Sequence, residues 1–255
     1  PAPRQPLSVA IITLNAESQL AECLASAAFA DEILVVDSGS MDGTAALAAA
    51  MGARVAHQDW LGYGPQKQFA VMAACHDWVL CLDADERVTP ELRQAIEREL
   101  RAPRHQAYRF ARRNRFLGRY LRHGEGHPDW SLRLFHRRHG RWSDDPVHEK
   151  VMPDGSVGTL SGDLLHDSAE SLATYLAKQN RYTTLAADAA LAAGRRSGPV
   201  KLVISPLVRF IKFFFLRQGF RDGLPGLVHI AIGCFNSFAK YAKMLERQSS
   251  DAALR

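Results

Sequence analysis

Short apolar runs alternate with alanine-rich, amphipathic segments over the first hundred residues. The runs are rich in branched side chains and have the length of buried strands, over residues 8–13, 32–37, 53–56 and 78–82. Helices are expected between and after them, over residues 17–28, 45–51, 66–74 and 90–100. This alternation predicts an α/β fold with a mostly parallel, Rossmann-like central sheet.

Polar side chains follow three of these predicted strands. Thr13 and Asn15 end the first strand, Asp37 ends the second, and Asp83 with Asp85 ends the fourth. Ligands of parallel α/β sheets bind beyond the carboxyl ends of the strands. We therefore expect these groups to meet at one edge of the sheet.

The segment Asp83-Ala84-Asp85 places two carboxylates one residue apart, directly after an apolar strand. In an extended segment both side chains point to the same side, and they need a counter-charge there. A divalent cation, Mg²⁺ or Mn²⁺, would supply it and would fill its shell with waters and substrate phosphates. The alternative is an acidic turn that caps the next helix.

The turn after the second strand contains Asp37, Ser38, Gly39 and Ser40. Asp37 could accept a hydrogen bond from a base N–H or a ribose hydroxyl, and the glycine would let the backbone approach a ligand. An ordinary β-turn is the alternative. The chain contains neither G-x-G-x-x-G nor G-x-x-x-x-G-K-[ST], so dinucleotide-binding and P-loop functions are excluded.

The remaining chain has a different pattern. Residues 104–165 have short strands and many arginines, histidines and tryptophans, and residues 170–194 form an alanine-rich helix. We expect one domain over residues 1–168, in two parts over 7–103 and 104–168. Residues 169–255 are expected to be a helical, basic and amphipathic C-terminal region.

Charge is distributed unevenly within the net charge of +5. Residues 1–100 hold 6 Lys/Arg against 14 Asp/Glu, whereas residues 195–247 hold 10 against 2. The acidic first part argues against a nucleic-acid partner, and the basic, apolar tail favours an anionic membrane surface or an anionic acceptor.

The apolar runs of the tail are interrupted by Arg209, Lys212 and Arg217. They favour an interfacial helix pair over a membrane span, with a helical cap on the catalytic domain as the alternative. Four separated cysteines and the lack of an apolar leader predict a cytoplasmic protein.

Three segments together resemble the nucleotide-sugar motifs of family 2 glycosyltransferases with the GT-A fold, in order and in separation. These are residues 11–17, residues 35–44 and residues 82–86. The segments at residues 60–68, 128–135 and 146–150 look more narrowly like lipopolysaccharide core β-glucosyltransferases that extend the inner-core heptose. The resemblance covers roughly residues 7–245. It implies a GT-A catalytic domain over residues 1–168, with a nucleotide-sugar half over 7–103 and an acceptor half over 104–168. A lipopolysaccharide acceptor also implies a location peripheral at the inner face of the bacterial inner membrane.

The resemblance implies a role for each matching residue. The nucleoside would be surrounded by Thr13, Asn15, Glu17, Asp37 and Ser38. Lys67 would approach the donor phosphates, and Asp83 and Asp85 would serve the metal, with Asp85 the better candidate for a direct ligand. The family inverts the anomeric centre, and UDP-glucose is the favoured donor. No Q-x-x-R-W occurs, so a single sugar transfer is expected rather than polymer synthesis.

An inverting transfer needs one general base at the acceptor hydroxyl. Asp129 is the candidate, with Glu125 as the alternative base and a salt-bridged Asp129 as the structural alternative. Arg133 could pair with a carboxylate or a phosphate, and Trp130 could stack on a sugar or belong to the core. His148 resembles the late histidine that some GT-A enzymes bring to the metal, and His166 is a weaker candidate.

Two other functions share part of this pattern. A polyprenyl-phosphate glycosyltransferase has the same nucleotide half, although the segments around Trp130 and His148 favour the lipopolysaccharide enzyme. A membrane- or nucleic-acid-binding module without catalysis would bind no UDP. Metal-dependent UDP binding separates this module from the enzymes.

Overall fold

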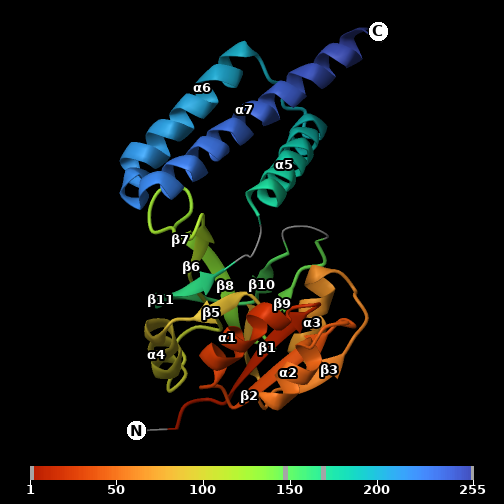
Figure 1. The fold of residues 1–255 in the computed structure, drawn as a ribbon, viewed down its shortest axis with the longest axis vertical. Helices are drawn as coiled ribbons and strands as arrows, with labels where there is room; N and C mark the ends of the chain where they lie inside the picture. The colour runs from red at the N-terminus through yellow and green to blue at the C-terminus, as the bar shows by residue number, and fades with distance from the viewer. Residues whose placement is uncertain (1–2, 146–148, 168–170, 254–255) are drawn as a thin grey trace. The chain divides into compact units, whose positions relative to one another are not determined.

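The computed structural model describes residues 3–145, 149–167 and 171–253 of the chain. It divides into two compact units (Figure 1). The sheet unit comprises residues 1–112 and 129–167, and the helical unit comprises residues 113–128 and 168–255. Residues 113–128, placed by sequence in the acceptor half, are thus grouped with the C-terminal helices.

The first part of the sheet unit is a parallel sheet in the order β3-β2-β1-β4. Strands and helices alternate along it: β1 (Leu7–Thr13), α1 (Glu17–Ala27), β2 (Glu32–Asp37), α2 (Thr44–Ala50), β3 (Arg54–His57), α3 (Tyr63–Ala73) and β4 (Trp78–Asp83). These elements lie close to their predicted positions. Helix α3 begins three residues before the predicted start at Gln66.

Apolar side chains cover both faces of this parallel sheet, as the continuous apolar runs require. One core cluster joins β1 residues such as Ile11 to Leu20 of α1 and to Leu92 and Ile96 of α4 (Pro90–Glu99). The other joins Val36 and Val79 to residues of α3. The sheet is therefore a buried middle layer, and only the ends of its strands are left for polar groups.

The second part of the sheet makes the whole sheet mixed rather than mostly parallel. It continues from β4 in the order β8-β6-β11-β5. The strands are β5 (Glu86–Val88), β6 (Ala107–Phe116), β8 (Asp129–His136) and β11 (Val157–His166), and three of their pairings are antiparallel: β4–β8, β6–β8 and β5–β11. Short connections suffice for antiparallel strands, whereas parallel strands need a crossover helix, and this part of the chain has few helices.

Three short strands complete the chain up to residue 167. Strand β7 (Arg119–Tyr120) pairs with the end of β6, and both segments belong to the helical unit. Strands β9 (Gly140–Trp142) and β10 (Val151–Pro153) form a separate antiparallel pair in the sheet unit.

The helical unit is built mainly from three long elements. They are α5 (Leu172–Ala192), α6 (Pro199–Phe210) with its π-helical continuation η1 (Ile211–Leu216), and α7 (Gly223–Ala253), which follows the short 3-10 helix η2 (Gly219–Asp222). Its buried apolar cluster is small and centres on Ala187, Ala190 and Met244. Among the described residues, no helix is both long enough and apolar enough to cross a bilayer.

Asp222 fastens residues 113–128 to the rest of the helical unit. Its carboxylate has no exposed surface and accepts hydrogen bonds from the backbone N–H groups of Arg122 (2.8 Å) and His123 (2.7 Å). It also lies 3.1 Å from the ring Nδ1 of His123. Burial raises the pKa of Asp222, but these hydrogen bonds outweigh burial and hold the pKa below its usual range.

Candidate active site

The parallel strands bring the predicted polar groups to one edge of the sheet. Thr13 is in register with Asp37 across β1 and β2, and Ile12 is in register with Asp83 across β1 and β4. The Thr13 hydroxyl donates to the Asp37 carboxylate at 3.0 Å. The carboxyl ends of three strands therefore present their polar residues side by side, as their positions in the sequence predict.

Two loops at this edge are connected by hydrogen bonds. Asn15, in the left-handed region at φ 50°, accepts from the backbone N–H of Met41 at 2.9 Å. Glu17 accepts from the backbone N–H of Gly43 at 2.9 Å. The Ser38 hydroxyl accepts from the side-chain amide of Gln66, at 3.0 Å. These predicted nucleoside-binding residues thus hold one another in place and form a preorganised rim.

Asp37 is the centre of this rim. Burial raises its pKa, but hydrogen bonds from Ser40, Thr13 and the Gly39 N–H outweigh that effect, so its pKa lies below the usual range. The Ser40 and Gly39 backbone N–H groups donate to one carboxylate oxygen at 2.8 and 3.0 Å. Asp37 is consequently a fixed anion that can only accept hydrogen bonds.

A continuous ion-pair chain crosses the site. It comprises seven residues of the sheet unit in spatial order: Glu149, Lys67, Asp83, Arg133, Glu86, Arg112 and Asp129. The successive nitrogen–oxygen distances are 2.9, 3.0, 2.9, 3.1, 3.4 and 2.8 Å. The chain connects the acidic cluster after β4 with the predicted base at the start of β8.

The middle of the ion-pair chain is deeply buried. Glu86 has no exposed surface, and Arg133 and Lys67 are 7% and 4% exposed. Burial raises the pKa of the Asp83 carboxyl, but Arg133 and Lys67 together hold that pKa far below its usual value. The Arg133 side chain keeps its charge because Glu86 and Asp83 outweigh the effect of burial and raise its pKa. Asp83 is therefore permanently charged and already paired.

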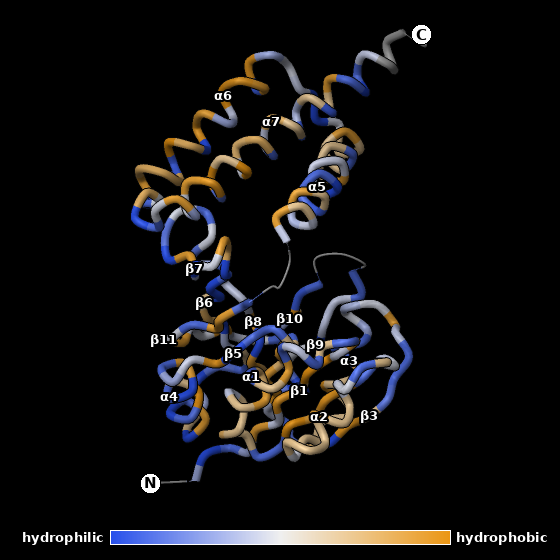
Figure 2. Tube along the Cα trace, in the orientation of Figure 1, coloured by the Kyte–Doolittle hydropathy of each residue, from blue (hydrophilic) through white to orange (hydrophobic). Residues whose placement is uncertain are grey.

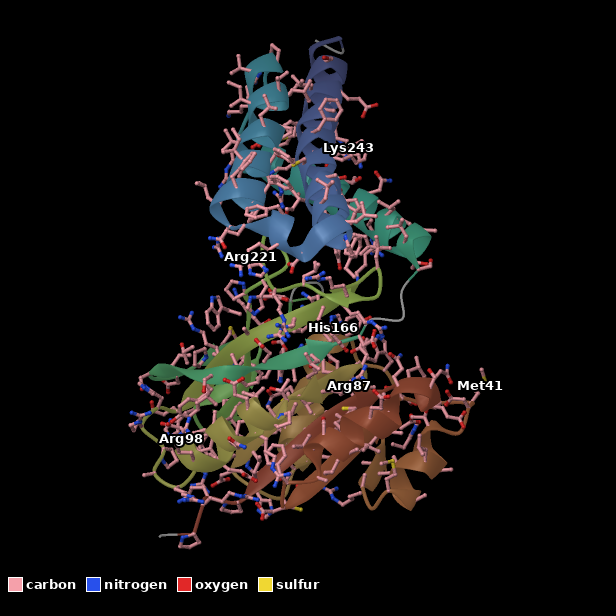
Figure 3. All side chains as sticks on the ribbon, turned by 60° about the vertical axis from the view of Figure 1, so that its left-hand side comes forward. Met41, Arg87, Arg98, His166, Arg221 and Lys243 are labelled. Atoms are coloured by element: carbon pink, nitrogen blue, oxygen red, sulfur yellow. The ribbon has the colours of Figure 1, made fainter. Side chains whose placement is uncertain are left out.

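Asp85 has a different neighbour from Asp83. Its carboxylate lies 3.1 Å from Nε2 of His166. His166, labelled in Figure 3, is the last residue of β11, which pairs with β5. An oxygen and an imidazole nitrogen at this separation are suitable first ligands for Mn²⁺, and a carboxylate with water ligands also suits Mg²⁺. No group of three such side chains occurs within residues 3–145, 149–167 and 171–253.

His148, the predicted late metal ligand, lies outside the described residues. Its neighbour Glu149 lies at the end of the ion-pair chain. His166 was the weaker of the two candidates by sequence, but the structure places it against Asp85.

The predicted acceptor residues do not all belong to the same unit. Asp129 is paired with Arg112, which is the salt bridge expected as the alternative to a general base. Its side chain is 36% exposed. Trp130 is exposed rather than a core residue, with the Arg109 guanidinium over its ring at 5.1 Å. Arg133 contacts two carboxylates, which were one of its two predicted kinds of partner. Glu125 belongs to the helical unit, where it pairs with Arg209.

The sequence alone indicates no site role for Glu86, and it indicates Arg112 only as one member of a basic stretch suited to an anionic acceptor. Both residues nevertheless connect the predicted site residues. Glu86 follows Asp85 directly and accepts from the Asp83 backbone N–H at 3.0 Å. Its position within the acidic segment was the available signal. Arg112 is one of six arginines between residues 109 and 122, and nothing in that run distinguishes it.

The fold and this acidic edge are those of a GT-A glycosyltransferase. Residues 8–153 match the model of glycosyl transferase family 2. The chain is 35% identical to the lipopolysaccharide core biosynthesis glycosyltransferase LpsC of Rhizobium meliloti (strain 1021), over 98% of this chain and 96% of LpsC. The chain therefore belongs to glycosyl transferase family 2 and is a glycosyltransferase.

Two further comparisons are more distant. The uncharacterized glycosyltransferase RT0209 of Rickettsia typhi is 30% identical over 94% of this chain and 87% of its own length. A crystal structure of Mycobacterium tuberculosis glucosyl-3-phosphoglycerate synthase with Mn²⁺, UDP and glucosyl-3-phosphoglycerate matches 44% of each chain, with 25% identity and a TM-score of 0.37. That score is too low to locate ligands in this chain.

Proposed function

We propose that this glycosyltransferase moves a hexose, glucose from UDP-glucose, onto the inner-core heptose of lipopolysaccharide with inversion at the anomeric carbon. The observation that carries the transfer chemistry is the pairing of Asp85 with His166 beside the neutralised Asp83. The similarity to LpsC over nearly the whole chain supports the lipopolysaccharide core as acceptor. The exposed Trp130 offers a flat apolar surface for a sugar ring.

The donor would lie along the carboxyl edge of the parallel strands. Asp37 and the loops that carry Asn15 and Glu17 would receive the nucleoside. Lys67 would approach the diphosphate. Arg133 offers a second cation, because its buried Nη1 has no hydrogen-bond partner among the described residues. A buried guanidinium N–H without a hydrogen-bond acceptor is costly, and an anion would supply that acceptor. This favours a phosphate beside Arg133.

Asp85 and His166 would hold a divalent cation, with Asp83 and the sequence-predicted His148 as further candidates. The cation would neutralise charge that develops on the departing diphosphate. Lys67 and Arg133 keep Asp83 neutralised, so that the donor diphosphate approaches a site with less net negative charge.

Asp129 would act as the general base. Its carboxylate would take the proton of the acceptor hydroxyl while that oxygen attacks the anomeric carbon and the bond to the diphosphate breaks on the opposite face. Arg112 holds the Asp129 carboxylate in place at 2.8 Å. The product would then have the β-configuration if the donor sugar is α-linked.

We also propose that the enzyme works in the cytoplasm, peripherally at the inner face of the inner membrane. No nucleic-acid partner is proposed. The lipid-linked nature of lipopolysaccharide and the basic helical unit support this location.

A donor and acceptor panel tests the proposal. The full chain would be incubated with UDP- and GDP-sugars and Mn²⁺, and with either heptose-containing core lipopolysaccharide or polyprenyl phosphate. We expect glucose transfer from UDP-glucose to the core, abolished by Asp129→Asn. Transfer to polyprenyl phosphate alone, or transfer only from a GDP-sugar, would contradict the proposal.

A further inference from the structure

An apolar stripe runs along the exposed side of α6 and η1. The structure buries no residue of either element. The exposed apolar positions recur at helical spacing: Val200, Val203, Ile204, Leu207, Val208, Ile211, Phe215 and Leu216. Val200 and Leu216, at the two ends of the stripe, are 68% and 76% exposed. An exposed apolar surface of this length is unusual for a helix of a soluble globular protein.

Helix α7, which packs beside α6, contributes further exposed apolar residues. Its exposed apolar residues are Leu224, Leu227, Phe235 and Phe238. The two helices lie side by side, and the hydroxyls of Ser205 and Ser237 are 2.8 Å apart (Figures 1 and 2). We call these exposed apolar residues of α6, η1 and α7 together the α6–α7 face. Apolar residues recur along both helices in Figure 2.

The charges around the α6–α7 face are mostly positive, although Glu125 of the same unit pairs with Arg209. Residues 199–245 contain seven Lys/Arg and a single acidic residue, Asp222. Asp222 is fully buried, so it contributes no negative charge to the surface. The exposed basic residues include Lys201, Lys212, Arg217 and Arg221. An apolar face with a mostly basic rim has the composition of helices that lie in an anionic membrane interface.

We infer that the α6–α7 face inserts into the interfacial region of an anionic lipid bilayer. The inference rests on the proposed peripheral location, and it does not depend on the transfer reaction. Phe215 and Leu216 would enter the boundary between headgroups and acyl chains, while Lys212 and Arg217 contact lipid phosphates. A second copy of the chain is a poorer occupant, because its own basic rim would face this one in a twofold contact.

Co-sedimentation with lipid vesicles tests the inference. The full chain would be mixed with vesicles of phosphatidylcholine alone or of phosphatidylcholine with phosphatidylglycerol. The double change Phe215→Glu with Leu216→Glu should lower partitioning at least about tenfold, because two apolar side chains are replaced by charges. Met51→Glu, which changes an exposed apolar residue of the sheet unit, is the matched control and should leave partitioning unchanged.

A second pair of changes isolates the charges. Lys212→Gln with Arg217→Gln keeps the apolar stripe. Each basic residue near an anionic surface is worth about fivefold in partitioning. We expect this variant to lose at least about tenfold on phosphatidylglycerol vesicles and nothing on phosphatidylcholine. Circular dichroism checks that all variants keep the wild-type helix content.

Three outcomes would overturn the inference. They are failure of the wild type to bind anionic vesicles, unchanged binding by the Phe215/Leu216 variant, and a wild-type dimer that this variant converts to monomer. UDP binding, measured by calorimetry without lipid, should be equal in all variants. Vesicle binding without any sugar transfer would reject the proposed function and leave this inference intact.

Discussion

Glu86 shows at the residue scale why the site is stable although it is crowded with charge. It has no exposed surface, and its carboxylate contacts two guanidinium groups, those of Arg133 and Arg112. An unpaired buried carboxylate is costly, whereas a buried carboxylate with charged hydrogen-bond partners is tolerated. The two arginines therefore allow three acids, Asp83, Asp85 and Glu86, to lie within four residues at the end of β4.

We expect Arg133→Met to destabilise the protein by about 3 kcal/mol, because Glu86 and Asp83 would lose a buried partner. Urea denaturation measures the change. Arg138→Met removes an arginine that is 72% exposed and pairs with Asp77, and it should cost less than about 1 kcal/mol. Equal costs for the two variants would show that burial of the ion-pair chain contributes nothing.

We expect Asp85→Asn and His166→Ala each to weaken Mn²⁺-dependent UDP binding at least about tenfold, because each removes a proposed metal ligand. Calorimetry with Mn²⁺ and with EDTA measures the effect, and the variants should match the wild type in EDTA. Asp154→Asn, on an exposed turn, is the control. If EDTA leaves the affinity of the wild type for UDP unchanged, a metal at this site is excluded.

At this scale the sequence predicts which residues gather but not how they pair. Thr13, Asp37 and Asp83 are the last residues of β1, β2 and β4. The alternation of strands and helices in the nearby sequence predicts that these strands are parallel, so the common edge of the three residues is predictable. The partnership of Glu86 with Arg112 depends on antiparallel strands that are distant in the sequence, and a run of six arginines gives no sign of which one turns inward.

At the element scale, the contact between β11 and α4 depends on a position without a side chain. Gly162 has φ +89°, and an added Cβ would lie 2.3 Å from the backbone nitrogen of Leu92. The helix backbone would have to move to admit it. The glycine thus sets the distance between the last long strand of the sheet unit and the helix that covers it.

We expect Gly162→Ala to cost about 3 kcal/mol, from both the clash and the strained backbone. Gly52→Ala is the matched control, since Gly52 has a similar φ of +84° and no atom within 4 Å of an added Cβ. It should cost only about 1 kcal/mol. Thermal or urea unfolding compares them, and equal costs would mean that backbone strain alone accounts for both.

The end of α4 should be sensitive to acid. Hydrogen bonds from Arg104 lower the pKa of Glu99 to about 2 despite its burial, and Tyr108 donates to the same carboxylate. Because the folded-state pKa is depressed, the stabilisation is complete above the usual glutamate pKa and is lost as pH falls toward the folded value. Since Arg104 is 78% exposed, solvent screens part of the interaction.

We therefore expect Glu99→Gln to cost about 1 to 2 kcal/mol at pH 7, and the cost to shrink by roughly half at pH 3. Urea midpoints of the two proteins at both pH values measure it. Glu91→Gln, in the first turn of the same helix, is the control. A cost that stays constant between the two pH values would exclude the depressed pKa as its source.

Periodicity predicts the elements well where each strand or helix is determined by its own residues. The strands β1 to β4 and the helices between them follow the apolar pattern closely. The antiparallel strands are less predictable because they are stabilised by pairing with distant segments. The arginine-rich β6 has little apolar alternation of its own, yet it pairs with β8 along six residues.

At the scale of the whole molecule, the division into two units predicts that one unit can open locally while the other stays folded. Asp222 holds residues 121–125 through contacts made wholly within the helical unit. We expect Asp222→Ala to raise amide hydrogen exchange of Arg122 and His123 at least about tenfold, because both amides lose their acceptor.

Strands β1 to β4 should keep wild-type exchange rates in that variant, because they belong to the sheet unit. Asp188→Asn, which removes the charge that pairs with Arg247 on the surface of the helical unit, should leave the exchange of Arg122 and His123 unchanged. Uniformly faster exchange through the whole chain would show that the two units unfold as one.

The grouping of residues 113–128 with the C-terminal helices has a consequence for chimaeras between relatives. Replacing only residues 168–255 by those of another family member would separate His123 from Asp222 and Glu125 from Arg209. Replacing residues 113–128 in the same exchange would transplant both pairs together. The smallest part of this chain that can be exchanged as a module is therefore discontinuous, and alignments that cut at a single point would miss it.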